Sequence, residues 1–412
     1  MKKHNFSAGP SILSDEVFNK ASNSVKELDN IGLSLIEISH RSKEFVKIME
    51  EARELSLNLL KLDSDEYASL FLQGGASTQF LMVAYNYLNK SAGYINTGSW
   101  SVKAMKEAKL FGDVKELASS QDKNFNYIPK NYKIDDSLDY LHITSNNTIF
   151  GTQFHSVPDS NNDLFADMSS DIFSRNIDYS KFSLIYAGAQ KNIGASGTTL
   201  VIIKKNLLEK VCRDVPSMLN YKTHLDKDSM FNTPPVFAIY TCLLSLRWLS
   251  KMGGIDEIEK RNNKKARIIY DEIDRNSQFK GFANIDDIIK NTEAITSVFN
   301  ITRALILNTT QAFSWQFIDY AGKVFVYLNS CPDQFLIQFY EQLATSENRS
   351  ISEMIILTLN SVKNSPSESL RKVSETLLKE MAEEAKFQYY EPNFQWIEED
   401  WNRDIKNVKG KN

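Results

Sequence analysis

Hydrophobic residues in the first two thirds of the chain follow two alternating patterns. Short continuous apolar runs predict strands at 68–72, 93–96, 141–144, 164–166, 184–187 and 199–203. Between these runs, apolar residues recur every three or four positions, which is the spacing of one helix face. Strands that alternate with helices are typical of an α/β domain with a mostly parallel sheet. In such sheets, ligands bind at the carboxyl ends of the strands.

The predicted helices carry residues suited to their ends. Ser14 is a favourable N-cap for a first helix, because its hydroxyl can accept a bond from an unpaired backbone N–H. The apolar face of that helix is predicted to comprise Val17, Ala21, Val25 and Leu28. A second helix is predicted over 43–60. After a pair of prolines, two long helical patterns cover 236–252 and 255–276, with two glycines at the boundary.

These two long helices predict how the chain divides into domains. We expect an N-terminal segment over 1–15, a large domain over 16–255 and a smaller α+β domain over 256–412. Beyond about residue 302 the hydrophobic patterns weaken. One further helix is predicted over 365–387, because Ser365-Pro366-Ser367-Glu368 forms a capping box.

Composition and charge narrow the class of protein. The 412 residues are 42% hydrophobic and 24% charged, as in a folded globular chain. The net charge of −4 argues against non-specific binding of nucleic acid. No apolar run reaches the roughly 18 residues of a membrane span, and no secretory signal pattern opens the sequence. The three cysteines are far apart, so neither a disulfide framework nor a metal site is expected. These features predict a cytoplasmic protein.

Lys191 is the residue that most strongly suggests chemistry. It follows a buried-looking strand in the segment SLIYAGAQKNIGASGTTLVII, where small residues and glycines allow close approach of the backbone. A surface lysine whose stem lies along apolar side chains is the ordinary alternative. A lysine in a desolvated pocket, however, is the residue that forms Schiff bases with carbonyl compounds.

A Schiff-base lysine that uses pyridoxal phosphate needs several helping groups, and the sequence offers each of them at a strand end. Asp167 could face the pyridine nitrogen, although an Asp there could also be a helix N-cap. The turn Gly74–Thr78 precedes a helix and could bind the phosphate. Trp100 could stack on the ring, and Thr148 could donate to a ring or phosphate oxygen. Together these residues predict a pyridoxal-phosphate site.

The same segments resemble the phosphoserine aminotransferase family, which consists of fold-type-I pyridoxal-phosphate enzymes. The resemblance covers about residues 1–281 in continuous order. It depends on HNFSAGPSIL, LIEISHRSKEF, LQGGAS, NTGSW, TSNNTIFGTQF, ADMSSDIFSR, AGAQKNIG, PSMLNY and MFNTPPVFAIY. It implies amino transfer between L-glutamate and 3-phosphohydroxypyruvate, with 4-phosphohydroxythreonine as a related substrate. It also implies a homodimer.

The resemblance assigns roles to individual residues. Lys191 would bind the cofactor covalently and Asp167 would pair with its ring nitrogen. The remaining cofactor contacts would come from Ala76, Ser77, Trp100, Thr148 and Gln190, and from Asn232 and Thr233 of the neighbouring subunit. Arg41, with His40 beside it, would bind a substrate carboxylate.

The C-terminal third departs from the family. Members carry a basic motif of the kind HRSVGGxRAS there, whereas the last histidine of this chain is His224. We therefore expect a weaker preference for phosphorylated substrates. Two alternatives remain open. One is a catalytically impaired homologue whose altered C-terminus binds a partner. The other is a desulfurase on the same fold that uses Cys331, although Gln190 stands where such enzymes usually have histidine.

Overall fold

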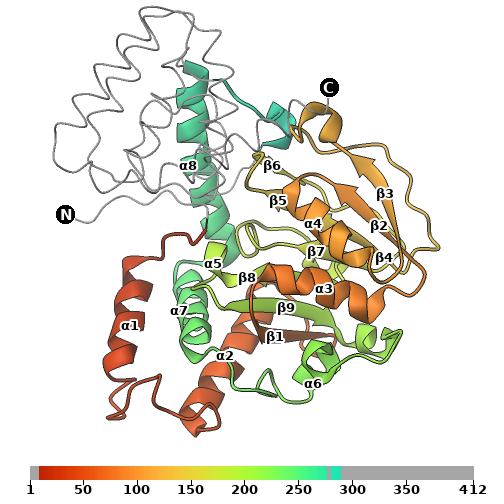
Figure 1. Cartoon of the computed structure of the whole chain (residues 1–412). Helices are drawn as coiled ribbons and strands as arrows, with labels where there is room; N and C mark the ends of the chain where they lie inside the picture. Colours follow the sequence, from red (N-terminus) through yellow and green to blue (C-terminus); the bar gives the residue numbers. More distant parts are fainter. Residues whose placement is uncertain (1–8, 276–279, 289–412) are drawn as a thin grey trace, which may run out of the picture. The chain divides into compact units, whose positions relative to one another are not determined.

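The computed structural model describes residues 9–275 and 280–288, which belong to one compact unit within Met1–Thr302 (Figure 1). The predicted α/β domain is confirmed. Its main sheet has the strand order β1-β9-β8-β7-β4-β2-β3. The strands are β1 (Tyr67–Gln73), β2 (Ser91–Asn96), β3 (Asp113–Ser119), β4 (Tyr140–Thr144), β7 (Leu164–Asp167), β8 (Leu184–Gly188) and β9 (Thr198–Lys204). A separate hairpin pairs β5 (Asn146–Asn147) with β6 (Thr152–Gln153).

The sheet is mostly parallel, as the sequence predicts. Strands β3, β2, β4, β7 and β8 run in one direction. Strand β9 is antiparallel to both β8 and β1, so β1 has the direction of the parallel set. The carboxyl ends of six strands therefore lie at one edge of the sheet, together with the first residues of β9.

Helices cover both faces of the sheet (Figure 1). Helices α1, α2 and α7 pack on one face, and α3 and α4 pack on the other. The helices are α1 (Asp15–Lys26), α2 (Lys43–Leu59), α3 (Ala76–Tyr87), α4 (Ser99–Ala108), α5 (Ala189–Asn192), α6 (Tyr221–Leu225), α7 (Val236–Lys251) and α8 (Gly254–Arg275). Short 3-10 helices span Gln121–Lys123, Tyr179–Lys181, Lys205–Lys210, Ser217–Leu219 and Ile285–Asp287.

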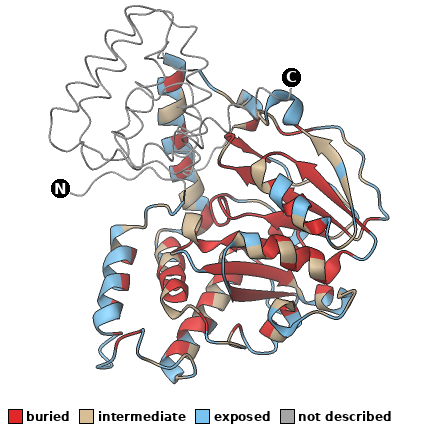
Figure 2. Ribbon diagram, viewed as in Figure 1, coloured by how far each residue is buried: buried red, intermediate tan, exposed pale blue. Residues whose placement is uncertain are grey.

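Side chains of the central strands alternate strictly between these two helical layers. In β7, Leu164 and Ala166 pack toward α1, α2 and α7, whereas Phe165 packs toward α3 and α4. In β8, Ile185 packs toward α1, α2 and α7, whereas Tyr186 packs toward α3 and α4. Because both faces are covered, the strands are buried throughout and their sequences are continuous apolar runs (Figure 2).

The first helix begins as predicted but buries less than predicted. Ser14 caps α1, and its hydroxyl accepts a bond from the Val17 amide at 3.3 Å. Val17 and Ala21 are buried. Val25, however, is 41% exposed, so the predicted apolar face is wrong at this position. Leu28 lies beyond the end of the helix but is buried in the same core as Val17 and Ala21.

Strand β3 was missed by the sequence analysis. It forms the edge of the sheet and, among the described residues, pairs only with β2, so most of its residues are half-exposed and its sequence mixes polar and apolar side chains. A strand without a continuous apolar run or a clean alternation gives no hydrophobic signal. The pairs of residues in β5 and β6 are likewise too short to leave a pattern.

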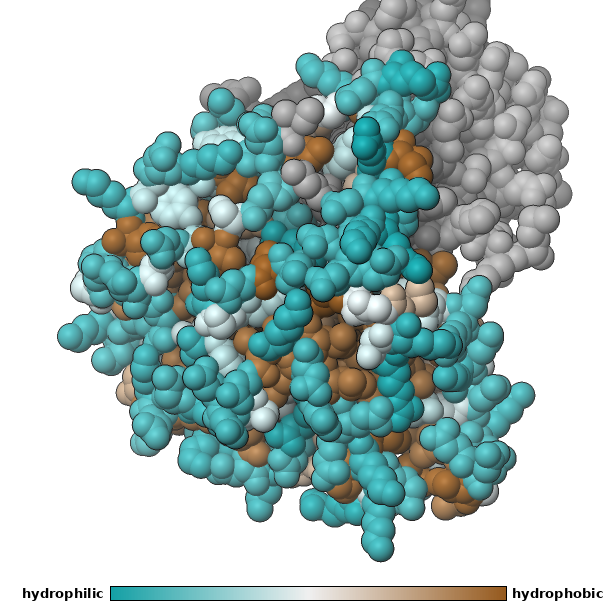
Figure 3. All heavy atoms as spheres, turned by 180° about the vertical axis from the view of Figure 1, so that it is seen from behind, coloured by the Kyte–Doolittle hydropathy of each residue, from teal (hydrophilic) through white to brown (hydrophobic). Residues whose placement is uncertain are grey.

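Much of the surface is hydrophilic, with scattered hydrophobic patches on the face seen from behind (Figure 3). One cluster of exposed large apolar residues lies in and just after α1: Phe18, Val25, Ile31, Leu33 and Ile36. Such clustering is typical of interaction surfaces. No helix in the described part of the chain combines the length and hydropathy that crossing a bilayer requires.

Several sequence predictions lie outside the described residues. These are the predicted helix over 365–387, the cysteine at 331 and the departure from the family after about residue 302. The domain boundaries at 15 and 255 also stay predictions. The two long helices are confirmed as α7 and α8, and Gly253 and Gly254 between them have positive φ angles.

Gly194 provides a test of the packing between α7 and the Lys191 segment. A Cβ atom at this position would approach the Cys242 thiol to 2.7 Å and its backbone nitrogen to 3.1 Å. We expect Gly194→Ala to lower the free energy of unfolding by about 1–3 kcal/mol, because α7 must shift. Gly281→Ala is the control, since its Cβ would enter open space. Equal urea-unfolding midpoints for the two variants would contradict this packing.

Candidate active site

Polar residues gather at the carboxyl edge of the sheet, on the side of α3 and α4. Asp167 ends β7 and is paired in register with Thr144 on β4 and Tyr186 on β8. It follows Phe165 by two positions, so by strand alternation its carboxylate faces the same side as that ring. Helices α3 and α4 begin at the same edge, directly after β1 and β2. The edge therefore combines a buried acid with two helix N-termini.

Lys191 lies at the centre of this arrangement. Its amine is 5.2 Å from the centre of the Trp100 ring and 3.5 Å from the Thr148 hydroxyl, to which it donates. The predicted strand ends at Gly188, and Lys191 belongs to α5, the single helical turn that follows. The side chain is half-buried, so it is neither a surface lysine nor a core residue.

The N-terminal segment packs directly against Lys191. The backbone amide of Ser11 donates to the carbonyl of Gln190 at 2.9 Å, and the Ser11 hydroxyl donates to the carbonyl of Lys191. A Cβ atom on Gly9 would lie 2.9 Å from the Lys191 side chain. Glycine at this position permits the close approach, and the segment is hydrogen-bonded to the backbone on which Lys191 is carried.

Asp167 is a buried carboxylate with few partners. Its Oδ1 accepts bonds from the Ser169 amide at 2.9 Å and the Ser169 hydroxyl at 2.6 Å. Burial raises the pKa of Asp167 above its ordinary value, while the bond from Ser169 and the positive charge of Lys191 oppose this effect. A cationic ligand at this edge would stabilise the ionised form.

The turn before α3 has the properties of an anion site. Its N-cap, Gly75, contributes no side-chain bond to the first turn of the helix, so the N–H groups of Ala76 and Ser77 are not capped in that way. A Cβ atom on Gly188 would lie 3.4 Å from the Ala76 nitrogen and 2.9 Å from the Gln190 amide oxygen. The turn, the end of β8 and the Lys191 helix thus lie close together.

Three buried polar atoms at this edge lack partners among the described residues. They are the indole nitrogen of Trp100, in the first turn of α4, the hydroxyl of Thr144, at the end of β4, and the amide oxygen of Asn146, in β5. Buried polar groups are normally hydrogen-bonded, so these unpaired atoms leave bonds at this edge that a polar ligand could complete.

The structure brings together only part of the predicted set. Lys191, Trp100 and Thr148 are in contact, and Asp167, Ala76, Ser77 and Gln190 line the same edge. The other four predicted residues have no described contact with Lys191. Arg41 is exposed just before α2, with His40 beside it. Asn232 and Thr233 form a turn, whose Thr233 carbonyl accepts a bond of 2.7 Å from Gln73 at the end of β1.

Four residues of this region were not predicted from the sequence: Ser11, Ser169, Asp171 and Arg175. Ser169 could have been found, because a serine two positions after an aspartate commonly donates to its carboxylate. Ser11 could not, because 180 positions separate it from Lys191. Of the described cysteines, Cys242 is buried and burial raises the pKa of its thiol. That thiol is therefore a poor nucleophile, while Cys331 lies outside the described residues.

Known proteins resemble this chain in sequence and in structure. A family model described as Aminotransferase class-V matches residues 3–305. The phosphoserine aminotransferase of Flavobacterium psychrophilum is 58% identical over 289 residues, which cover 70% of this chain and 81% of that protein. A solved phosphoserine aminotransferase, described for radiation damage of its Schiff base, has a TM-score of 0.68 at 44% identity, over 69% of this chain and 81% of its own. The PLP-bound phosphoserine aminotransferase from Trichomonas vaginalis has a TM-score of 0.67 at 33% identity, over 70% and 82%.

Because Asp167 is buried, its contribution to the stability of the folded chain should depend on pH. Because burial raises the pKa of Asp167 above its ordinary value of 3.8, the folded chain binds more protons than the unfolded chain above that pH. Asp167 therefore costs stability as the pH rises. We expect Asp167→Asn to stabilise the ligand-free protein, increasingly so as the pH rises from about 4 up to the raised pKa of Asp167, above which the gain stays constant.

Urea-unfolding midpoints measured across that range provide the test. Asp135→Asn is the control, since hydrogen bonds from Ser137 lower the pKa of that exposed carboxyl to about 2 and it stays ionised throughout. A difference between Asp167→Asn and the unmodified protein that does not grow with pH would contradict the prediction.

Proposed function

The chain belongs to the aminotransferase class-V family, and we propose that it is a pyridoxal-phosphate-dependent phosphoserine transaminase. The reaction moves an amino group between L-glutamate and 3-phosphohydroxypyruvate, giving O-phosphoserine. The observation that carries this proposal is the position of the Lys191 amine. It lies between the Trp100 ring and the Thr148 hydroxyl, where its charge acts on the buried carboxylate of Asp167.

The residues at this edge fit pyridoxal phosphate. The unpaired Trp100 indole nitrogen and Thr144 hydroxyl are buried atoms that a polar ligand would satisfy. The turn before α3 offers backbone N–H groups at the positive end of a helix, which suit a phosphate. Asp167 offers the negative charge that a protonated ring nitrogen requires. Lys191 would hold the cofactor covalently, Trp100 would cover the ring, and Ala76 and Ser77 would bind the phosphate.

The bound cofactor supplies an electron sink that weakens the Cα–H bond of the amino-acid substrate. The protein supplies the rest. Asp167, ionised against the ring nitrogen, holds the proton on that nitrogen. The free amine of Lys191 would be the general base that takes the Cα proton and later returns it. The Thr148 hydroxyl would orient that amine, and the N-terminal segment would hold the Lys191 backbone.

Substrate binding is assigned to residues outside this cluster. Arg41 and His40 would bind a carboxylate, and the absence of the basic C-terminal motif predicts a reduced preference for the phosphate group. Two lost charge-assisted contacts would lower that preference by a factor of about 10² to 10⁴. The small-molecule substrates and the composition support a cytoplasmic location.

Amino transfer measured on the full chain with pyridoxal phosphate tests the function. We expect L-glutamate and 3-phosphohydroxypyruvate to give 2-oxoglutarate, and Lys191→Ala to abolish the reaction. Lys204→Ala, which changes a lysine at the other end of the sheet, is the control. In the reverse direction, O-phosphoserine should react faster than serine, but by a modest margin. A protein that binds the cofactor and transfers no amino group would contradict the proposal and favour the impaired homologue.

The homodimer is proposed on two features of the surface. The apolar cluster in and after α1 is suited to an interface, and the Asn232–Thr233 turn precedes the buried helix α7. Gln73 fixes this turn at the same sheet edge as the phosphate-binding turn. From there, Asn232 and Thr233 would bind the phosphate of the partner's cofactor.

We therefore expect a dimer in solution and about tenfold weaker cofactor binding in Asn232→Ala, the cost of one hydrogen bond to a charged group. Sedimentation at low micromolar concentration and a pyridoxal-phosphate titration measure the two properties. Asn126→Ala serves as the control, because this asparagine lies in the loop after β3. A monomer that still retains the cofactor tightly would refute the arrangement.

A further inference from the structure

A buried ion pair lies beneath the active-site edge. Asp171 and Arg175 occupy the turn that follows β7, and both are buried. The Arg175 guanidinium donates twice to Asp171 Oδ2, from Nε at 3.2 Å and from an Nη at 2.9 Å. None of the hydrogen bonds described for the pair is made with Lys191, and the proposed reaction uses neither residue. A buried ion pair generally adds little to stability, because removing two charges from water is costly. Stability alone therefore does not explain why an ion pair is buried at this place.

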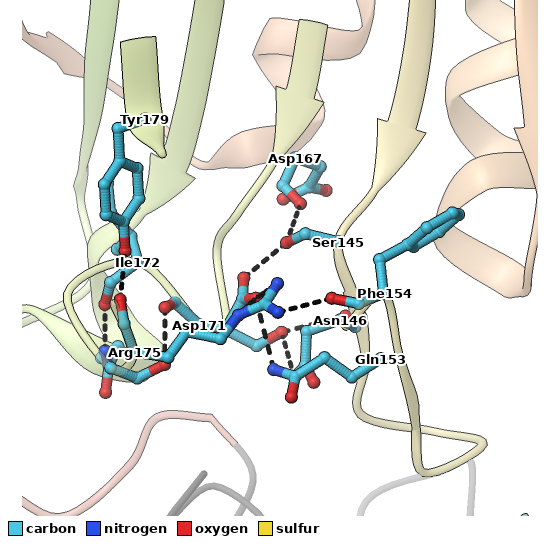
Figure 4. A network of polar contacts seen from close by, with 12 residues as sticks. Ser145, Asn146, Gln153, Phe154, Asp167, Asp171, Ile172, Arg175 and Tyr179 are labelled. Carbon is cyan, nitrogen blue, oxygen red and sulfur yellow. Dashed lines mark hydrogen bonds and ion pairs between the residues drawn. The ribbon is translucent and has the colours of Figure 1, made fainter. Parts of the chain in front are cut away.

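The pair joins the ends of two neighbouring strands (Figure 4). The hydroxyl of Ser145, the residue after β4, lies 3.0 Å from the Asp167 carbonyl and also contacts Asp171 Oδ1. The Ser145 backbone amide donates to the same Asp167 carbonyl at 3.0 Å. Asp171 thus fixes the strand end that carries Asp167.

The same pair holds the hairpin that carries Thr148. Arg175 donates a further bond to the carbonyl of Phe154, and Gln153 of β6 donates to Asp171 Oδ2 at 3.4 Å (Figure 4). Thr148 begins the turn of this hairpin, directly after β5. Gln153 in β6 and Phe154, the residue after it, are therefore both hydrogen-bonded to the ion pair.

The other strand of the hairpin is fixed by its asparagines. Asn146 exchanges bonds of 2.8 and 3.0 Å with the Ser170 hydroxyl, beside Asp171. Asn147 donates at 3.0 Å to the hydroxyl of Thr97, just before the helix of Trp100. Both strands of the hairpin are therefore hydrogen-bonded to neighbouring segments. The ion pair is also connected to Asp167, because Ser145 contacts both Asp171 and the Asp167 carbonyl.

We propose that Asp171 and Arg175 are positioning residues that fix Thr148 and Asp167 relative to Lys191, and thereby set the affinity for pyridoxal phosphate. This inference rests on the proposed function. An apolar pair of similar volume could fill the same space, but it could not make directed bonds to Ser145, Gln153 and the Phe154 carbonyl at once. Arg175→Lys keeps the charge and loses the planar group that makes several of these bonds.

The test is a double-mutant cycle on the dissociation constant for pyridoxal phosphate, measured from the absorbance of bound cofactor. We expect Arg175→Lys to weaken binding about 10-fold to 100-fold, as loss of supporting contacts does at other cofactor sites. Thr148→Val should weaken it about tenfold by loss of one hydroxyl. If Arg175 acts through the hairpin, the double variant should bind within about twofold of Arg175→Lys alone.

Controls separate this effect from general loss of stability. Arg247→Gln removes an ion pair between α7 and α2, distant from the edge, and should leave the dissociation constant unchanged. Ser145→Ala is a milder variant for the same cycle and should show the same non-additivity if Arg175→Lys does not fold.

Independent, multiplying losses in the double variant would overturn the inference, as would wild-type affinity in Arg175→Lys or Thr148→Val. In those cases the unmodified protein would still bind the cofactor and transfer amino groups, so the proposed function would stand. An unmodified protein that binds no pyridoxal phosphate would overturn both.

Discussion

The carboxylate of Asp167 is buried at the end of β7, and the active-site edge is organised around the cost of keeping a charge there. Burial raises its pKa, and only Ser169 and the charge of Lys191 oppose that shift. A site of this kind is incomplete without a cation, because a buried ionised group needs a partner. The protonated ring nitrogen of pyridoxal phosphate supplies that cation in the proposed enzyme. The buried carboxylate that lowers the stability of the ligand-free fold would therefore be the group that pairs with the bound cofactor.

The sheet explains how distant residues meet at this carboxylate. Parallel strands place their carboxyl ends at one edge, and alternation directs Asp167 toward the side on which α3 and α4 begin. Trp100, Thr148 and Lys191 come from separate strand ends and still lie within a few ångström of one another. Thr148 then accepts a bond from the Lys191 amine, and the N-terminal segment bonds the backbone carbonyl of the same residue. The strands thus determine which side chains meet at this edge, and contacts from the loops fix their final positions.

Much of this arrangement could be predicted from the sequence, because continuous apolar runs mark buried strands and the groups that follow them share an edge. Lys191, Asp167, Trp100, Thr148 and the turn Gly74–Thr78 were proposed in that way, and family resemblance added Gln190. Three features escaped prediction for physical reasons. Strand β3 is a half-exposed edge strand and lacks a hydrophobic pattern. Ser11 contacts Lys191 only through the tertiary fold. The ion pair of Arg175 with Asp171 has no sequence pattern, and only the fold shows that both residues are buried.

The central claim is that one lysine at this edge binds pyridoxal phosphate covalently, opposite a buried aspartate. Reduction of the cofactor-bound protein with borohydride, followed by proteolysis and mass spectrometry of the peptides, tests it most directly. The account predicts a single pyridoxyl label on the peptide that contains Lys191, and no label in Lys191→Ala. A label on another lysine, or bound cofactor that borohydride does not fix to the chain, would contradict it.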